Sequence, residues 1–265
     1  MIYGFEQVFS VMRYPAGESH VEIRHLPITQ RDVIQVSNCR GFEDLCNVVT
    51  AAEILRNLGR VEPTWFIPYF PFGRHDRRRE RGDGLELKVA LDLVSHLDVV
   101  TMDPHSDVLG QLRHIPQVAV VDCMNKHFGI FDEPAGQVVV IPDHGGVKKA
   151  AAWLDGRDVA QGFKKRDPST GSLSGFDVDR GDFHGCPCLI VDDICDGGGT
   201  FIGLADVLND RGAGALTLAV SHGLFTKGTE ELAKWFDRII STGPFKESNV
   251  ARVPHHLIFE AGGFV

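Results

Sequence analysis

A single segment near position 190 constrains the fold more than any other part of the chain. It begins with the apolar run Cys188–Val191 and continues through the carboxylates Asp192, Asp193 and Asp196 into a glycine-rich turn. Apolar residues then recur with helical spacing from Phe201 to Leu208. A buried strand, a glycine-rich turn and an amphipathic helix in this order are typical of one unit of a parallel α/β sheet. Backbone N–H groups of such a turn can bind an anion, and the carboxylates before it suit sugar hydroxyls or a magnesium ion. An ordinary strand–helix turn with no ligand is the alternative interpretation.

The rest of the chain repeats this alternation of short apolar strands and amphipathic helices. Near the start, a β-hairpin of Val8–Tyr14 and His20–Arg24 is expected around Pro15-Ala16-Gly17. The predicted strands are Val33–Val36, Trp65–Ile67, Val99–Met102, Val118–Val121, Val138–Ile141, Cys188–Val191 and Ala215–Val220. The predicted helices are Leu45–Leu55, Leu87–Leu97, Val147–Leu154 and Phe201–Leu208. The pattern predicts α/β domains whose mainly parallel sheets are flanked by helices.

The length of 265 residues fits one large or two ordinary domains, at about 150 residues per domain. A polar stretch, Asp132–Gly136, contains Pro134 and separates two runs of strands and helices. We therefore expect two α/β domains, 1–133 and 134–265.

The net charge of −9 argues against a nucleic-acid partner, because non-specific nucleic-acid binding needs a diffuse positive field. No apolar run approaches the roughly 18 residues of a membrane-spanning helix, and the first residues lack the basic start of a signal peptide. The six cysteines show neither C-x-x-C spacing nor a partnered histidine, so reduced thiols are expected. These features predict a cytoplasmic protein with no nucleic-acid partner and no membrane partner.

The loop Pro71–Gly84 carries five arginines in a chain that is acidic overall. Guanidinium groups bind phosphate oxygens in bidentate pairs, so a glycine-bounded loop of arginines indicates a polyphosphate clamp. A solvated surface loop is the alternative, since charge runs are often only solvated. No P-loop sequence is present, so a nucleoside triphosphate would be held by other means.

Further acid, imidazole and cationic groups follow predicted strands. Asp103 and His105 follow Val99–Met102, Asp143 follows Val138–Ile141, and Lys164–Arg166 lies beyond Val159. Open α/β sheets bind ligands at the carboxyl ends of their strands, so these groups are expected to converge on one crevice.

Taken in order, these segments resemble the ribose-phosphate pyrophosphokinase family. The matching stretches are Arg13–Glu18, Ile67–Asp76, Thr101–His105, Ile141–Gly146, Lys164–Arg166, Val191–Thr200 and Ser221–His222. The resemblance implies two phosphoribosyltransferase-like domains, the first with an arginine-rich ATP loop and the second with a sugar-phosphate loop. It also implies a magnesium-dependent reaction in which the anomeric hydroxyl of ribose 5-phosphate attacks the β-phosphorus of ATP and AMP is released.

The same resemblance implies roles for individual residues. Lys164, Arg166, Arg74 and His105 would be catalytic. ATP would be contacted by Tyr14, Glu18, Arg74, His75 and Asp76, with Tyr14 and Glu18 approaching adenine from a neighbouring subunit of a homo-oligomer, at least a dimer. Magnesium would lie near His105 and Asp143. The ribose and its 5-phosphate would be bound by Asp192, Asp193, Asp196, Gly197, Gly198, Gly199 and Thr200.

The chain also departs from the family pattern. Pro15 and Ala16 stand where the family usually has Ser and Asp, which removes a polar contact to the base. Gly197 stands where a Thr is expected, which removes a hydroxyl and leaves a roomier phosphate pocket. The chain is expected to lack the family's first strand and helix and its closing helix.

Three other functions remain open at this point. The same chemistry could act on ADP-ribose, feeding NAD synthesis, which Gly197 motivates. A phosphoribosyltransferase would share the sugar-phosphate loop but would not need the arginine clamp. A regulatory homologue would bind nucleotides without transfer, although it would not need Lys164, Arg166 and His105, which would act on a transition state.

Overall fold

The computed structural model describes residues 1–24, 28–29, 32–60, 62–132, 136–166, 173–243 and 249–264. The chain divides into two compact units, Met1–Ile115 and Pro116–Val265. The boundary predicted at 133 falls within 133–135, outside the described residues. The division precedes it because helix α4 (Gln117–Phe128) packs against α7 (His255–Ala261) and β14 (Val250–Val253), which places α4 in the second unit.

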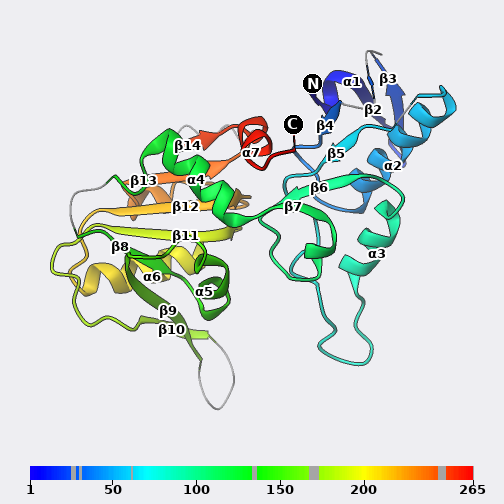
Figure 1. Cartoon of the computed structure of the whole chain (residues 1–265). Coiled ribbons are helices and arrows are strands. Elements are labelled where there is room, and N and C mark those ends of the chain that lie inside the picture. The colour runs from blue at the N-terminus through cyan, green and yellow to red at the C-terminus, as the bar shows by residue number, and fades with distance from the viewer. Residues whose placement is uncertain are drawn as a thin grey trace. The chain divides into compact units, whose positions relative to one another are not determined.

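The first unit contains a five-stranded parallel sheet in the order β1-β4-β5-β6-β7. Its strands are β1 (Ile2–Gly4), β4 (Val33–Gln35), β5 (Thr64–Phe66), β6 (Val99–Met102) and β7 (Arg113–Ile115). Its helices are α1 (Phe5–Val8), α2 (Phe42–Asn57), α3 (Glu86–Val94) and the 3-10 turn η1 (Leu109–Gln111). Helix α2 buries Leu45, Val48, Ala52 and Leu55, the apolar stripe that predicted it. Figure 1 shows α2 and α3 along one side of this unit.

The predicted hairpin is confirmed as β2 (Phe9–Arg13) and β3 (Ser19–Ile23), a separate antiparallel pair. The expectation that the family's first strand and helix are missing is wrong. Strand β1 and helix α1 precede the hairpin, and β1 pairs with the parallel strand β4. Such short elements leave little periodic signal in a sequence.

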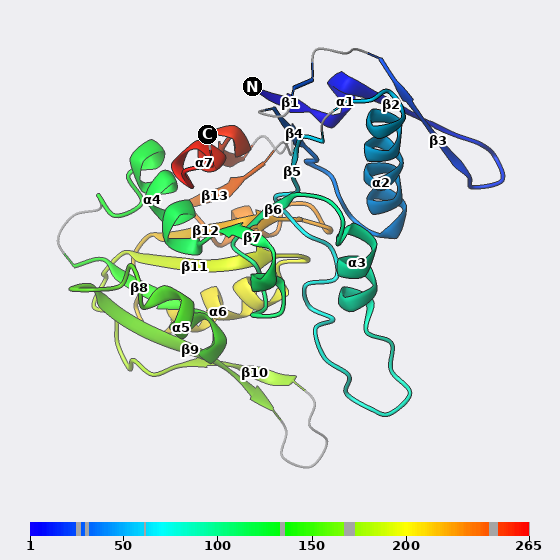
Figure 2. The same cartoon turned by 45° about the vertical axis from the view of Figure 1, so that its right-hand side comes forward.

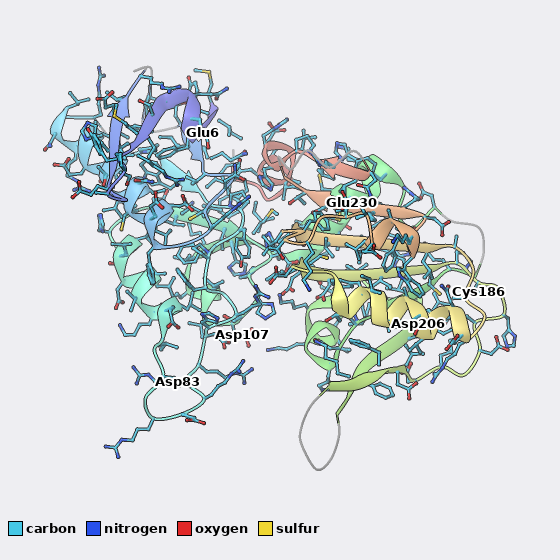
Figure 3. The ribbon with its side chains drawn as sticks, turned by 180° about the vertical axis from the view of Figure 1, so that it is seen from behind. Glu6, Asp83, Asp107, Cys186, Asp206 and Glu230 are labelled. Atoms are coloured by element: carbon cyan, nitrogen blue, oxygen red, sulfur yellow. The ribbon has the colours of Figure 1, made fainter. Side chains whose placement is uncertain are left out.

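The second unit contains a seven-stranded sheet in the order β10-β9-β8-β11-β12-β13-β14. Its strands are β8 (Val138–Ile141), β9 (Asp158–Arg166), β10 (Leu173–Val178), β11 (Cys188–Cys195), β12 (Leu216–Gly223), β13 (Arg238–Thr242) and β14. The strands run parallel except for the antiparallel pair of β9 and β10. Helices α4 and α5 (His144–Ala150) cover one face, and α6 (Gly199–Asp210) covers the other (Figures 1 and 3).

Two expectations for the second unit are wrong. Val118–Val121 is part of helix α4, which buries Gln117, Val120, Val121 and Met124 at helical spacing and ends at Gly129, whose φ is 55°. A four-residue apolar run cannot by itself distinguish a strand from a buried helical face. A closing helix is also present, because α7 follows Pro254 and buries Ile258 and Phe259.

Candidate functional site

The glycine-rich turn connects the carboxyl end of β11 to the start of α6 (Figure 2). Gly198 has φ 80° and precedes the first residue of α6. That left-handed conformation is strained for a residue with a side chain, and a Cβ at Gly198 would also lie 3.2 Å from Leu232. The start of a helix points unpaired backbone N–H groups outward, so this turn can bind a phosphate.

Two adjacent carboxylates lie at the end of β11. Asp193 is buried, while Asp192 is half-buried and accepts the backbone N–H of Asp193 through Oδ1 at 2.8 Å. The ammonium of Lys149, on α5, lies 2.6 Å from Oδ2 of Asp193. Sequence reasoning did not assign Lys149. The one available signal was its position three residues after the Gly145-Gly146 pair.

Asp196 is held by the segment that follows β12. The hydroxyl of Thr226 donates to Oδ1 of Asp196 at 2.7 Å, and the Thr226 backbone N–H donates to the Asp196 carbonyl at 3.0 Å. Next to it, the Cβ position of Gly197 lies 3.3 Å from Cδ of Lys227, and the φ of Gly197 is outside the left-handed region. Gly199 and the half-buried Thr200 form the first turn of α6. The structure thus brings the predicted ribose-phosphate residues together around one turn.

Asp143 begins helix α5. Its Oδ1 accepts the backbone N–H of Gly146 at 3.2 Å, which makes it the N-cap residue, and the side chain remains exposed. A Cβ at Gly146 would lie 2.9 Å from Cγ2 of Ile141, so the close approach requires glycine there. Asp143 therefore caps a helix and still presents carboxylate oxygen to solvent.

Lys164 lies on β9, directly opposite Phe176 of β10. Opposite residues of an antiparallel pair share a face, and the Phe176 ring packs against Gly203 of α6. The exposed side chain of Lys164 is therefore on the face of the β9–β10 pair that packs against α6. The side chain of Arg166 lies outside the described residues.

The arginine-rich loop connects β5 to α3 in the first unit. Its start is fixed by Phe72, whose ring stacks on Phe42 with centroids 4.3 Å apart. Near its far end, Asp83 accepts the backbone N–H groups of Arg79 and Glu80 at 2.9 and 3.0 Å (Figure 3). The loop's five arginine side chains, Arg74, Arg77, Arg78, Arg79 and Arg81, are exposed.

His105 lies beside the base of this loop. A Cβ at Gly73 would lie 3.5 Å from Cβ of His105, so His105 lies beside Gly73, the residue that precedes Arg74. His75 approaches Glu86, with Nδ1 3.6 Å from Oε2, and Asp76 approaches Arg77 at 3.6 Å. Between β6 and His105, the buried Asp103 has φ 34° and donates its N–H to the Ile115 carbonyl at 2.7 Å. A non-glycine residue at positive φ costs conformational energy and is enriched at functional sites.

Tyr14 and Glu18 lie at the tip of the β2–β3 hairpin. The Tyr14 side chain is 47% exposed and Glu18 is exposed as well. The Tyr14 N–H donates to the Glu18 carbonyl at 2.8 Å, which holds both residues on the turn. Tyr14 and Glu18 therefore lie together on an exposed turn. In the sequence, this turn is far from His105 and from the arginine-rich loop.

In the described part of the chain, no group of three or more His, Cys, Asp or Glu side chains is arranged to hold a metal ion by itself. The same residues include no helix that is both long and apolar enough to cross a membrane. His105 belongs to the first unit and Asp143 to the second, and among the described residues neither is part of a cluster of three or more possible metal ligands.

Known proteins resemble this chain over most of its length. It is 30% identical over 257 residues to ribose-phosphate pyrophosphokinase of Methanopyrus kandleri, covering 90% of this chain and 86% of the relative. It is 32% identical over 227 residues to the Marinomonas protein of the same name, covering 80% and 70%. The fold is similar to that of phosphoribosylpyrophosphate synthetase from Mycobacterium smegmatis, with a TM-score of 0.77, 22% identity and coverage of 97% and 88%. No family model matches the chain.

Proposed function

The chain belongs to the ribose-phosphate pyrophosphokinase family, and from this membership we propose which groups it transfers and which residues act. The β,γ-pyrophosphoryl group of ATP passes to the anomeric hydroxyl of ribose 5-phosphate. The anomeric oxygen forms a bond to the β-phosphorus. The bond from that phosphorus to the oxygen shared with the α-phosphorus breaks, and AMP leaves with this oxygen. The products are phosphoribosyl pyrophosphate and AMP.

The observation that carries this proposal is the order of groups at the end of β11. Asp192 and Asp193 lie near the end of β11, a few residues before the left-handed Gly198 and the start of α6. Carboxylates accept hydrogen bonds from sugar hydroxyls, while the backbone N–H groups of the turn suit a phosphate. Asp192, Asp193 and Asp196 bind the ribose, and Gly197, Gly198, Gly199 and Thr200 bind its 5-phosphate.

The triphosphate is bound by cationic side chains. Arg74 is exposed on a loop whose base is fixed by the Phe72–Phe42 stack. Guanidinium and ammonium groups stabilise the charge that develops on phosphoryl oxygens in an in-line transfer. Arg74, Lys164 and Arg166 take this role, with His75 and Asp76 beside Arg74.

The residues present fit magnesium as the metal. Asp143 presents exposed carboxylate oxygen, and hard oxygen ligands are what magnesium prefers. Magnesium usually keeps several waters and is held by one or two carboxylates and substrate phosphates, so no closed protein cage is required. When bound, it neutralises charge on the phosphate oxygens. Asp143 would hold it, and His105 is the second residue that we propose for the metal.

The hairpin tip supports assembly into at least a dimer. Tyr14 is a large side chain left 47% exposed at the end of a β-ribbon. In the proposed assembly, Tyr14 and Glu18 contact the adenine bound by a neighbouring copy. Truncating the tip would then weaken ATP binding without removing any residue of the sugar-phosphate turn.

ADP-ribose is a second candidate acceptor, and Gly197 favours it. Gly197 has no side chain, and the flexible side chain of Lys227 lies against it, with Cδ 3.3 Å from its Cβ position. A phosphoribosyltransferase has no use for the exposed arginine-rich loop, which argues for the pyrophosphokinase chemistry.

Acceptor-dependent formation of AMP from ATP and magnesium tests the proposal. We expect Asp193→Asn to raise KM for ribose 5-phosphate, because an amide replaces one carboxylate oxygen with a donor. Equal AMP release with and without an acceptor would refute it, since that result describes ATP hydrolysis.

A further inference from the structure

The side chain of Lys227 lies across the phosphate turn. From the Cβ position of Gly197, Cδ of Lys227 is 3.3 Å away and Cε is 3.4 Å away. The far end of the lysine stem therefore covers Gly197, and the ammonium lies one bond beyond Cε. Within the residue ranges described above, this exposed ammonium has no carboxylate partner.

The backbone that carries Lys227 is fixed on the turn. Leu224 and Phe225 donate their N–H groups to the Cys195 carbonyl at 2.8 and 3.2 Å. Thr226 bonds Asp196 through both its N–H and its hydroxyl. These contacts fix the backbone just before Lys227 beside the turn, so its side chain starts close to Gly197.

Two features of this contact bear on the ligand. Because Gly197 has no side chain, the stem of Lys227 can lie against the turn. The ammonium of Lys227 adds one positive charge beside the turn. The backbone N–H groups at the start of α6 already suit one phosphate. A further exposed ammonium next to them suits a second anionic group attached to the first.

We propose that Lys227 is a specificity-determining residue that binds the second phosphate of an acceptor whose ribose carries a 5′-diphosphate ester. Such an acceptor keeps the anomeric hydroxyl that receives the pyrophosphoryl group. Lys227 then favours the diphosphate ester over the monophosphate. This assignment rests on the proposed function of the turn as a ribose-phosphate site.

Binding to Lys227→Met tests the assignment, with ADP-ribose as the diphosphate ester and ribose 5-phosphate as the monoester. Methionine keeps most of the stem that covers Gly197 and removes the charge. We expect the Kd for ADP-ribose to rise about tenfold, as expected for losing one charge-assisted hydrogen bond, and the Kd for ribose 5-phosphate to change less than about twofold. Lys234→Met is the matched control, because Lys234 is exposed in the same unit and pairs with Glu231. It should change neither Kd.

Gly197→Thr provides a second variant that retains the lysine. Its Cβ would meet Cδ of Lys227 at 3.3 Å and push the flexible side chain aside, without a strained φ. We expect this variant to raise the Kd for ADP-ribose more than the Kd for ribose 5-phosphate. Equal weakening of both ligands by Lys227→Met, or no change in either, would overturn the assignment.

Pyrophosphoryl transfer by the wild type separates this assignment from the function on which it rests. AMP formed with either acceptor supports the proposed function, whatever the Kd ratio of Lys227→Met. No AMP with either acceptor refutes the proposed function, and the Kd ratio still decides whether Lys227 binds a second phosphate.

Discussion

The ammonium of Lys149 lies 2.6 Å from Oδ2 of Asp193 and connects α5 to the end of β11. The Asp193 side chain is only 8% exposed, against 28% for Lys149. A carboxylate this buried needs a partner, because water cannot solvate it. The ion pair therefore fixes the orientation of an acid that we assign to ribose binding.

Lys149→Met should lower the free energy of unfolding by about 2 kcal/mol, because Asp193 loses a charged partner in a buried position. It should also raise KM for the acceptor, while Lys149→Arg restores most of both. Urea unfolding and steady-state kinetics measure the two effects. Lys126→Met, which removes an exposed lysine of α4, is the control. A stability change no larger than that of the control would show that the pair contributes little.

Arg74→Ala should lower kcat/KM by about 100-fold with little change in melting temperature. An exposed loop charge contributes within about 0.5 kcal/mol to folding, whereas a group that binds the transferring phosphates stabilises the transition state by several times more. Arg60→Ala removes an exposed arginine just beyond the end of α2 and should leave kcat/KM unchanged. Normal turnover in Arg74→Ala would indicate that Arg74 does not bind the phosphates and that the loop is only a solvated surface loop.

Activity should require a divalent cation, since a triphosphate and Asp143 repel each other without one. Asp143→Asn should raise the magnesium concentration needed for half-maximal activity. Asparagine is a good N-cap residue, so α5 should remain capped and the melting temperature should hold. Full activity of the wild type in excess chelator would contradict the magnesium requirement, and an unchanged magnesium dependence in the variant would remove Asp143 from the site.

Acid should destabilise the second unit through His255. Burial, and then the charges of His222 and His256, lower the pKa of His255 from 6.5 to about 3. Between these values the unfolded chain binds a proton that the folded protein does not, so stability falls as pH drops below 6.5. The loss is about 2 kcal/mol by pH 5, at about 1.4 kcal/mol per pH unit.

Denaturant unfolding from pH 7 to pH 4.5 measures this slope in the wild type and in His255→Gln. The variant should show a shallower slope. His256→Gln removes only the smallest of the three causes of the lowered pKa, so it should change the slope less than His255→Gln does. An equal slope in wild type and His255→Gln would mean that other groups cause the acid sensitivity.

The sequence predicted those elements whose apolar pattern is long or flanked by turn residues. The apolar stripe from Leu45 to Leu55 predicted a helix, which the structure shows as α2. The turn at Pro15-Ala16-Gly17 predicted a hairpin, which the structure shows as β2 and β3. Val118–Val121 was misassigned because four consecutive apolar residues fit a strand as well as a helical face. The segment is a helix that buries Gln117, Val120, Val121 and Met124. This burial depends on packing against distant parts of the chain, which the local sequence pattern does not show.

The part of the candidate site that could be predicted is the part whose functional groups are adjacent in the sequence. The carboxylates and glycines from Asp192 to Gly199 lie adjacent in sequence, so their turn is visible without a structure. Lys149 and Lys227 reach the same turn from α5 and from the segment after β12. Contacts between segments this far apart arise from the strand order β8-β11-β12, which brings their carboxyl ends side by side.

The fate of the β-phosphorus of ATP tests the central claim most directly. The protein is incubated with magnesium, an acceptor and ATP labelled at its β-phosphorus, and the products are separated and identified by mass. The account predicts that the label appears in a sugar product heavier by one pyrophosphoryl group, with unlabelled AMP in equal amount. Labelled ADP together with a sugar product heavier by a single phosphoryl group would contradict it.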